Sequence, residues 1–131
     1  MQFTINKNST LPFLDIEPII NGRDTYEDLF YLVQSADITF SMTNVNTGIK
    51  KIANAPCEII EIPDEECTNK FVIRYKWNKR DTNEAGSYIG NFKIKFNDNT
   101  LTLNNKPIVG DLIVPISEDL NILIQNNTFN K

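Results

Sequence analysis

The sequence predicts an all-β fold, either a β-sandwich or a small barrel of Greek-key type. Two observations carry this prediction. Several segments alternate between apolar and polar residues, and clusters of Asn, Asp, Gly and Pro separate them at intervals of roughly 8–12 residues. We count about seven or eight short strands. The chain of 131 residues fits one domain over 1–131, since a domain typically holds roughly 100–200 residues.

The alternation is clearest in Phe71–Trp77, Tyr88–Phe96 and Ile38–Met42. In these segments, most of the alternate positions hold an aromatic or β-branched residue, and the positions between them are mostly polar. Half-buried antiparallel strands have this pattern, whereas a helix would place residues two apart on different faces. We predict that Phe71–Trp77 and Tyr88–Phe96 are neighbours in one sheet. Their lysines and arginine, with Lys79 and Arg80 beside them, would then form one basic face.

The first third of the chain is less regular. Thr4–Asn6 is expected to be a terminal strand, and Leu11–Ile20 an irregular or edge strand, because Pro12 and Pro18 cannot donate to a ladder. Thr25–Gln34 is the one segment expected to be helical. Its apolar residues follow the i, i+3, i+4, i+7 spacing of a helix face: Tyr26, Leu29, Phe30 and Val33.

The rest of the chain reads as strands and turns. Asn44–Gly48 predicts a hairpin loop between the strands Ala36–Thr43 and Gly48–Ala53. The remaining expected strands are Glu58–Ile62, Thr100–Leu103, Asp111–Ile116 and Leu120–Gln125. Pro115 indicates an edge position or a bulge. The tail Asn126–Lys131 is polar and is expected to fray or to serve in assembly.

The composition disfavours several function classes. The formal net charge is −4, which argues against the phosphate-neutralising surface of a nucleic-acid binder. Histidine is absent, which removes the commonest general base and metal ligand. No apolar run approaches the ~18 residues of a membrane helix, and no signal peptide is visible. We therefore expect no enzyme, metal, cofactor, nucleic acid or membrane, although a hydrolase that uses carboxylates alone stays open.

Three groups of residues could still carry chemistry. The acidic stretch of Glu58, Glu61 and 64–66 could supply a carboxylate pair or calcium ligands, but a solvated turn is favoured. Cys57 and Cys67 are favoured as unpaired thiols, and a disulfide stays open. Exposed aromatic residues could stack on a sugar, although three of them lie on the apolar phase of their strands and favour core packing. The aromatic candidates are Tyr26, Phe30, Tyr31, Tyr75, Trp77 and Tyr88.

Five segments go beyond the general β pattern. Ile73–Trp77 carries v-x-Y-x-W, and Asp81–Asp98 carries D-T-x-x-x-G-x-Y-x-x-x-F-x-v-x-F-x-D. Shorter matches occur at 3–12, 36–42 and 113–120. Together they resemble the immunoglobulin-like domain found at the N-terminus of tailed-phage upper baseplate proteins and in many small phage virion proteins.

The resemblance implies an immunoglobulin-like antiparallel β-sandwich with one short helical insert and no catalytic residues. The family-motif core residues would be Tyr75, Trp77, Gly86, Tyr88 and Phe92. The chain would be made in the bacterial cytoplasm and assembled in many copies into the virion. It would act as a capsid auxiliary or decoration protein, a head-fibre base or a tail or baseplate adaptor. Its partners would be capsid, head-fibre, tail or baseplate subunits.

The insert, Asp24–Gln34, is the expected contact with these partners, because it is more apolar than a solvated loop should be. The candidate interface residues are Leu29, Phe30, Tyr31 and Val33. At least one terminal segment, Thr4–Asn6 or Leu120–Gln125, is expected to contact a neighbour as well. The alternative function is a carbohydrate-binding β-sandwich module, which would need several aromatic rings exposed in one groove.

Overall fold

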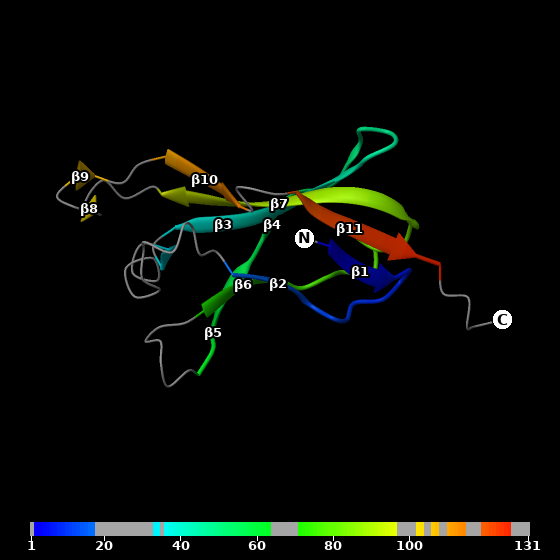
Figure 1. Cartoon of the computed structure of the whole chain (residues 1–131), viewed down its shortest axis with the longest axis horizontal. Helices are drawn as coiled ribbons and strands as arrows, with labels where there is room; N and C mark the ends of the chain where they lie inside the picture. Colours follow the sequence, from blue (N-terminus) through cyan, green and yellow to red (C-terminus); the bar gives the residue numbers. More distant parts are fainter. Residues whose placement is uncertain are drawn as a thin grey trace.

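A computed structural model describes residues 2–17, 33–34, 36–63, 71–96, 102–103, 106–107, 110–114 and 119–126. The regular elements of this part of the chain are eleven strands, so the predicted all-β class is confirmed. Two sheets contain all but two of these strands, which is consistent with the predicted sandwich (Figure 1). The number exceeds the seven or eight expected because several strands are only two or three residues long.

The larger sheet has the order β1-β11-β7-β3-β4, and β10 also pairs with β7. The strands are β1 (Gln2–Asn6), β3 (Asp37–Asn44), β4 (Lys50–Pro56), β7 (Gly86–Phe96), β10 (Gly110–Val114) and β11 (Leu120–Gln125). β10 and β11 follow one another along the same edge of β7, since β10 pairs with 92–96 and β11 with 86–90. Pro115 falls between these two strands and lies outside the described residues.

The two terminal strands pair with each other. β1 lies parallel to β11, with Gln2 opposite Asn121 and Asn6 opposite Gln125, so the expectation of a purely antiparallel fold is wrong at this position. Ile5, Ile122 and two further apolar side chains of these strands are buried in the chain's own core. Their apolar character is therefore explained by folding and gives no indication of an interface.

The smaller sheet has the order β2-β6-β5. Its strands are β2 (Leu14–Ile16), β5 (Glu58–Glu61) and β6 (Phe71–Tyr75), and the separate short pair is β8 (Thr102–Leu103) with β9 (Lys106–Pro107). The prediction that β6 and β7 are neighbours in one sheet is wrong, because they belong to different sheets. Alternation indicates which face of a strand is apolar, and it does not identify the strand's partner.

The chain changes sheets within one extended run, at Cys57. β4 pairs with β3 in the larger sheet, and β5 follows immediately and pairs with β6 in the smaller one. The Cys57 amide donates to the carbonyl of Ile38, which holds the crossing point against β3. A bulge precedes it: Asn54 has a φ of 53° and its amide donates to the Ser41 hydroxyl. Bulges twist an edge strand and so discourage edge-to-edge pairing.

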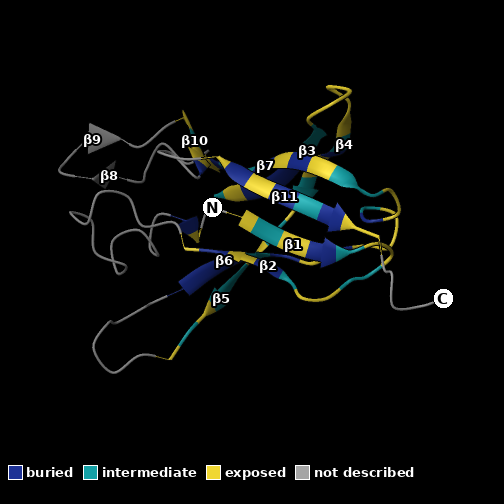
Figure 2. Ribbon diagram, turned by 45° about the vertical axis from the view of Figure 1, so that its right-hand side comes forward, coloured by how far each residue is buried: buried dark blue, intermediate teal, exposed yellow. Residues whose placement is uncertain are grey.

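The hydrophobic core lies between the two sheets. Figure 2 shows the alternation of buried and exposed residues along β11 and β7 that the sequence pattern predicts. Phe40 of β3 links the sheets, because its ring centroid lies 4.8 Å from that of Tyr75 on β6 and 4.9 Å from that of Phe92 on β7. Removing an aromatic side chain from such a core typically costs about 3–5 kcal/mol.

The family-motif residues occupy this core. Tyr75, Trp77, Tyr88 and Phe92 are all buried, as expected from the phase of their strands, and Gly86 is the first residue of β7. Gly90 of β7 carries no sequence signal that singles it out, yet it is tightly constrained. A Cβ atom there would lie 2.8 Å from a ring carbon of Phe40 and from the Cδ1 atom of Ile122.

The predicted insert is only partly described. Of its candidate interface residues, Leu29, Phe30 and Tyr31 lie outside the described residues, as does most of the expected helix. Val33 is fully buried and belongs to the hydrophobic core. Its assignment to an interface is therefore wrong, because its side chain has no surface to offer. Helical spacing of apolar residues indicates that one face is buried. It does not indicate whether that face is buried in the chain's own core or against another protein.

Candidate functional site

Three chain connections meet at one end of the sandwich, on the right in Figure 1. They are the β1–β2 connection (7–13), the β3–β4 hairpin loop (45–49) and the β6–β7 loop (76–85). The Asn8 amide donates to the Thr82 carbonyl over 2.9 Å, and the Val45 amide donates to the Ser87 carbonyl over 3.0 Å. We call this surface the loop end.

A carboxylate braces the β6–β7 loop from inside. The Tyr75 hydroxyl donates to Oδ2 of Asp81 over 2.6 Å, and the Asn78 amide donates to the same oxygen over 2.8 Å. Burial, and then the hydrogen bond to Asp81, raise the pKa of Tyr75 above its usual value. The phenol therefore stays neutral and keeps donating over the physiological pH range. Asp81 thus joins the backbone of the loop to Tyr75 at the end of β6.

Two further hydroxyl groups hold the same loop. Thr82 is fully buried, and its Oγ1 donates to the carbonyl of Ser9 in the β1–β2 connection over 2.8 Å. The Tyr88 hydroxyl donates to the carbonyl of Glu84 over 2.8 Å. Burial, and then the charge of Glu84, raise the pKa of Tyr88. The β6–β7 loop is thus fixed at its start, its middle and its end.

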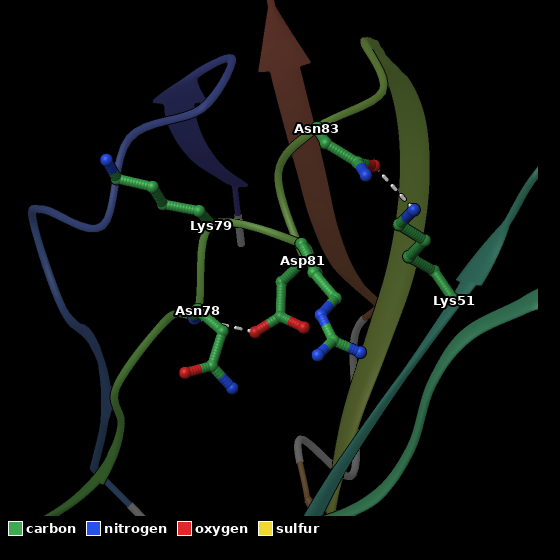
Figure 3. Close-up of a pocket in the computed structure, with 6 residues that line it drawn as sticks. Lys51, Asn78, Lys79, Asp81 and Asn83 are labelled. Carbon is green, nitrogen blue, oxygen red and sulfur yellow. Dashed lines mark hydrogen bonds between the residues drawn. The ribbon is translucent and has the colours of Figure 1, made fainter.

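Beside this braced loop lies a hollow of about 750 Å³. It is lined by Lys51, Asn78, Lys79, Arg80, Asp81 and Asn83 (Figure 3). Lys51 comes from β4 and its Nζ donates to Oδ1 of Asn83 over 2.6 Å, which ties the two elements together. We call this site the basic hollow, because three cations and one carboxylate line it.

Two cations of the basic hollow lack the carboxylate partner that three other described cations have. Within the described residues, Lys79 and Arg80 are exposed and form no ion pair. On the smaller sheet, by contrast, Arg74 binds Asp15 through two hydrogen bonds of 2.8 and 3.1 Å. The remaining described ion pairs join Lys76 to Glu58 at 2.9 Å and Lys93 to Asp111 at 3.5 Å.

The predicted single basic face therefore does not form. β6 and β7 lie in different sheets, and Arg74, Lys76 and Lys93 each have a carboxylate partner. Sequence reasoning noted Lys79 and Arg80 but missed Lys51, Asn78 and Asn83. No signal in the sequence joins Lys51 to a loop that lies more than 25 residues further along the chain.

Exposed apolar residues also gather at the loop end. The described residues include five large apolar side chains that are exposed, and three of them, Leu11, Val45 and Ile49, belong to its connections. Val45 and Ile49 flank the tip of the β3–β4 hairpin, and Ile49 lies two residues before Lys51 of the basic hollow. Apolar residues beside unpaired cations are typical of a protein-binding surface.

The structure describes some of the candidate carboxylates and one of the two thiols. The described residues contain no cluster of three or more His, Cys, Asp or Glu side chains that could hold a metal ion. Glu58 pairs with Lys76, and 64–66 lie outside the described residues, as does Cys67. Cys57 is a free, half-buried thiol, and burial raises its pKa to about 12. It is therefore almost entirely protonated at neutral pH and a poor nucleophile.

The aromatic residues bear on the carbohydrate-binding alternative. Tyr75, Trp77 and Tyr88 are buried and cannot form a stacking platform. Tyr26 and Tyr31 lie outside the described residues, as does Phe30.

No helix in the described part of the chain is long and apolar enough to cross a membrane. Comparisons with protein-family models, curated proteins and solved structures found no match for this chain.

Proposed function

We propose that this chain is an immunoglobulin-like, non-enzymatic structural protein of a tailed-phage virion. It would dock on other virion proteins as a capsid auxiliary or decoration protein, a head-fibre base or a tail or baseplate adaptor. Made in the bacterial cytoplasm, it would be present in many copies per particle. It would act through its surfaces alone.

The strand order carries the immunoglobulin-like part of the proposal, and the resemblance of the sequence motifs carries the virion role. In a variable-type immunoglobulin domain, one sheet holds strands A, B, E and D, and the other holds G, F, C and C′. The order β2-β6-β5 corresponds to B-E-D, and the order β11-β7-β3-β4 corresponds to G-F-C-C′. The chain order of these strands is also that of the immunoglobulin fold. β1 differs in lying beside β11.

A second feature supports the immunoglobulin-like assignment. Immunoglobulin domains have a tyrosine near the start of strand F whose hydroxyl group bonds the backbone a few residues upstream. Tyr88 lies near the start of β7, and its hydroxyl donates to the carbonyl of Glu84. Both residues belong to the Asp81–Asp98 segment that resembles the phage family.

The distribution of charged and exposed apolar side chains supports the docking role. The described acidic residues and the described thiol serve structure or face solvent, whereas the loop end combines unpaired cations with exposed apolar residues. A domain with these properties can contribute binding surface and little else. A virion auxiliary protein would dock on its neighbours through such a surface.

Co-purification with particles tests the proposal. The chain would be tagged at its native locus, particles banded on a density gradient, and its copy number measured by quantitative mass spectrometry against the major capsid protein. We expect a constant number of many copies in the particle band, with the tag alone, produced in parallel, left in the unbound fractions. Absence of the chain from the particle band would overturn the virion assignment.

A further inference from the structure

We propose that the basic hollow binds a carboxylate-bearing, partly apolar segment of a partner protein. This inference rests on the proposed docking function and assigns it to one place on the chain. The hollow is lined by side chains from β4 and from the β6–β7 loop, so it exists only in the folded domain (Figure 3).

Charge makes the hollow selective for an anion. Lys79 and Arg80 have no carboxylate partner among the described residues, whereas the arginine and two of the lysines on the sheet faces do. The one carboxylate of the hollow, on Asp81, already accepts hydrogen bonds from Tyr75 and Asn78. The donors of Lys79 and Arg80 are consequently available to a ligand, and an arginine side chain can bind a carboxylate through two hydrogen bonds.

The hollow is also preorganised. Asp81, Thr82 and Tyr88 fix the loop that carries Lys79 and Arg80, and the Lys51–Asn83 hydrogen bond fixes its other wall. A site held in this way loses little conformational entropy when a ligand binds. The braces have a second consequence, which is that substitutions of Lys79 and Arg80 should leave the fold intact.

The surroundings favour a protein segment over a polyphosphate. Val45 and Ile49 are exposed on the hairpin loop that precedes β4, and Ile49 lies two residues before Lys51, which lines the hollow. They could cover the apolar residues that flank a bound carboxylate. A nucleic acid carries a phosphate at every nucleotide, so it would meet the net charge of −4 along its whole length, whereas a segment with one carboxylate needs only the cations of the hollow.

Titration by NMR tests the inference in solution. The probe is a short capped peptide of alternating leucine and glutamate, and the control peptide has glutamine in place of glutamate. We expect saturable amide shifts at Lys79, Arg80 and Asn83 with the first peptide and none with the second. Binding should weaken as salt is added, because exposed charges are screened.

Two charge-matched double variants locate the site. Lys79→Gln with Arg80→Gln should weaken peptide binding by about tenfold or more, as expected when a charged contact is lost. Lys93→Gln with Lys95→Gln removes the same charge from the outer face of β7 and should leave binding within about twofold. Thermal unfolding of both variants would confirm that they fold. Lys51→Gln is the reserve variant, since it removes a cation from the opposite wall of the hollow.

Three results would overturn the inference. Equal losses in the two double variants would mean unspecific attraction, and equal binding of the glutamine peptide would mean that no carboxylate is recognised. Saturation of the hollow by inorganic sulfate, with no binding of the glutamate peptide, would make it a small-anion site.

Occupancy of the particles by the variants separates this inference from the proposed virion function. If the Lys79/Arg80 variant occupies particles as well as wild type, the inference fails and the virion role stands. If wild type is absent from particles but the peptide binds the hollow, only the virion role fails.

Discussion

Two of the three connections that meet at the loop end are held in different ways. The β6–β7 loop contains the fully buried Thr82 and is fixed by hydrogen bonds to Tyr75, Ser9 and Tyr88, which come from three other elements. The β3–β4 hairpin loop is exposed. Its internal bonds are local: the amides at 46 and 47 donate to Oδ1 of Asn44, and the Gly48 amide donates to the Asn44 carbonyl.

Because their hydrogen bonds differ, the β6–β7 loop and the β3–β4 hairpin loop have different roles. Long-range bonds make the β6–β7 loop part of the folded framework, so the cations it carries are held in fixed positions. Local bonds shape the hairpin turn without committing Val45 and Ile49 to the core, so these side chains remain on the surface. Function generally resides in loops that a rigid scaffold positions, and the basic hollow lies where the braced loop and the hairpin strand meet.

The largest expected effect comes from Trp77, where the braced loop meets the core. Trp77→Ala should lower the free energy of unfolding by about 3–5 kcal/mol, because its ring packs against Phe3, Phe40 and Tyr75. Trp77→Phe should cost less than about 1.5 kcal/mol. It keeps an aromatic ring and removes Nε1, the one buried side-chain nitrogen or oxygen in the described residues without a hydrogen-bond partner. Urea unfolding measures the loss of unfolding free energy in each variant. Equal losses in Trp77→Ala and Trp77→Phe would contradict this packing.

The same substitution in each loop gives a matched comparison. Thr82→Ala should cost about 1–2 kcal/mol, because it leaves a cavity and an unpaired carbonyl at Ser9. Thr47→Ala should cost less than about 0.5 kcal/mol, because Thr47 is exposed and accepts one bond from the Ile49 amide at 3.2 Å. Comparable losses in urea unfolding would show that the two loops are equally important to stability.

Alkaline pH should loosen the braced loop selectively. The folded-state pKa of Tyr75 is raised above its usual value of 10.0, so its contribution to stability is complete below pH 10 and is lost as the pH rises further. Tyr75→Phe should therefore show a shallower fall of unfolding free energy above pH 10 than wild type. Cys57, with a pKa of about 12 when folded, contributes a similar loss from about pH 9 in both proteins. Identical slopes in the two proteins would rule out the Tyr75 contribution.

The smallest effect on stability is expected at the hairpin tip. Ile49→Ser should change the unfolding free energy by less than about 0.5 kcal/mol, because the side chain is 68% exposed. It should nevertheless weaken binding of the leucine–glutamate peptide. Calorimetric melting measures the change in stability, and the NMR titration measures the change in peptide affinity. A large drop in melting temperature would place Ile49 in the folded core.

Local patterns of the sequence predicted the elements well. The alternation along Tyr88–Phe96 identified β7 and its buried face, and Asn44–Gly48 identified the hairpin. Period two and turn chemistry are properties of neighbouring residues, so the sequence displays them directly. The burial of Trp77 and Phe92 followed from the same periodicity.

Partners distant in the sequence could not be predicted in this way. The parallel pairing of β1 with β11 joins the two ends of the chain, and the separation of β6 from β7 depends on the path of the loop between them. The basic hollow has the same origin, since Lys51 reaches Lys79 and Arg80 only through the tertiary fold. Val33 shows the opposite error, because this one residue of the apolar helical pattern is predicted at an interface and lies in the core.

Hydrogen–deuterium exchange tests the contrast between the two loops most directly. The amide of Asn8 donates to the carbonyl of Thr82 in the braced loop, whereas the amides at 46 and 47 donate only within the hairpin turn. We predict that the Asn8 amide exchanges through large-scale unfolding, and at least about 100-fold more slowly than the other two. Similar exchange rates in the two loops would contradict the account of a braced loop that presents the basic hollow.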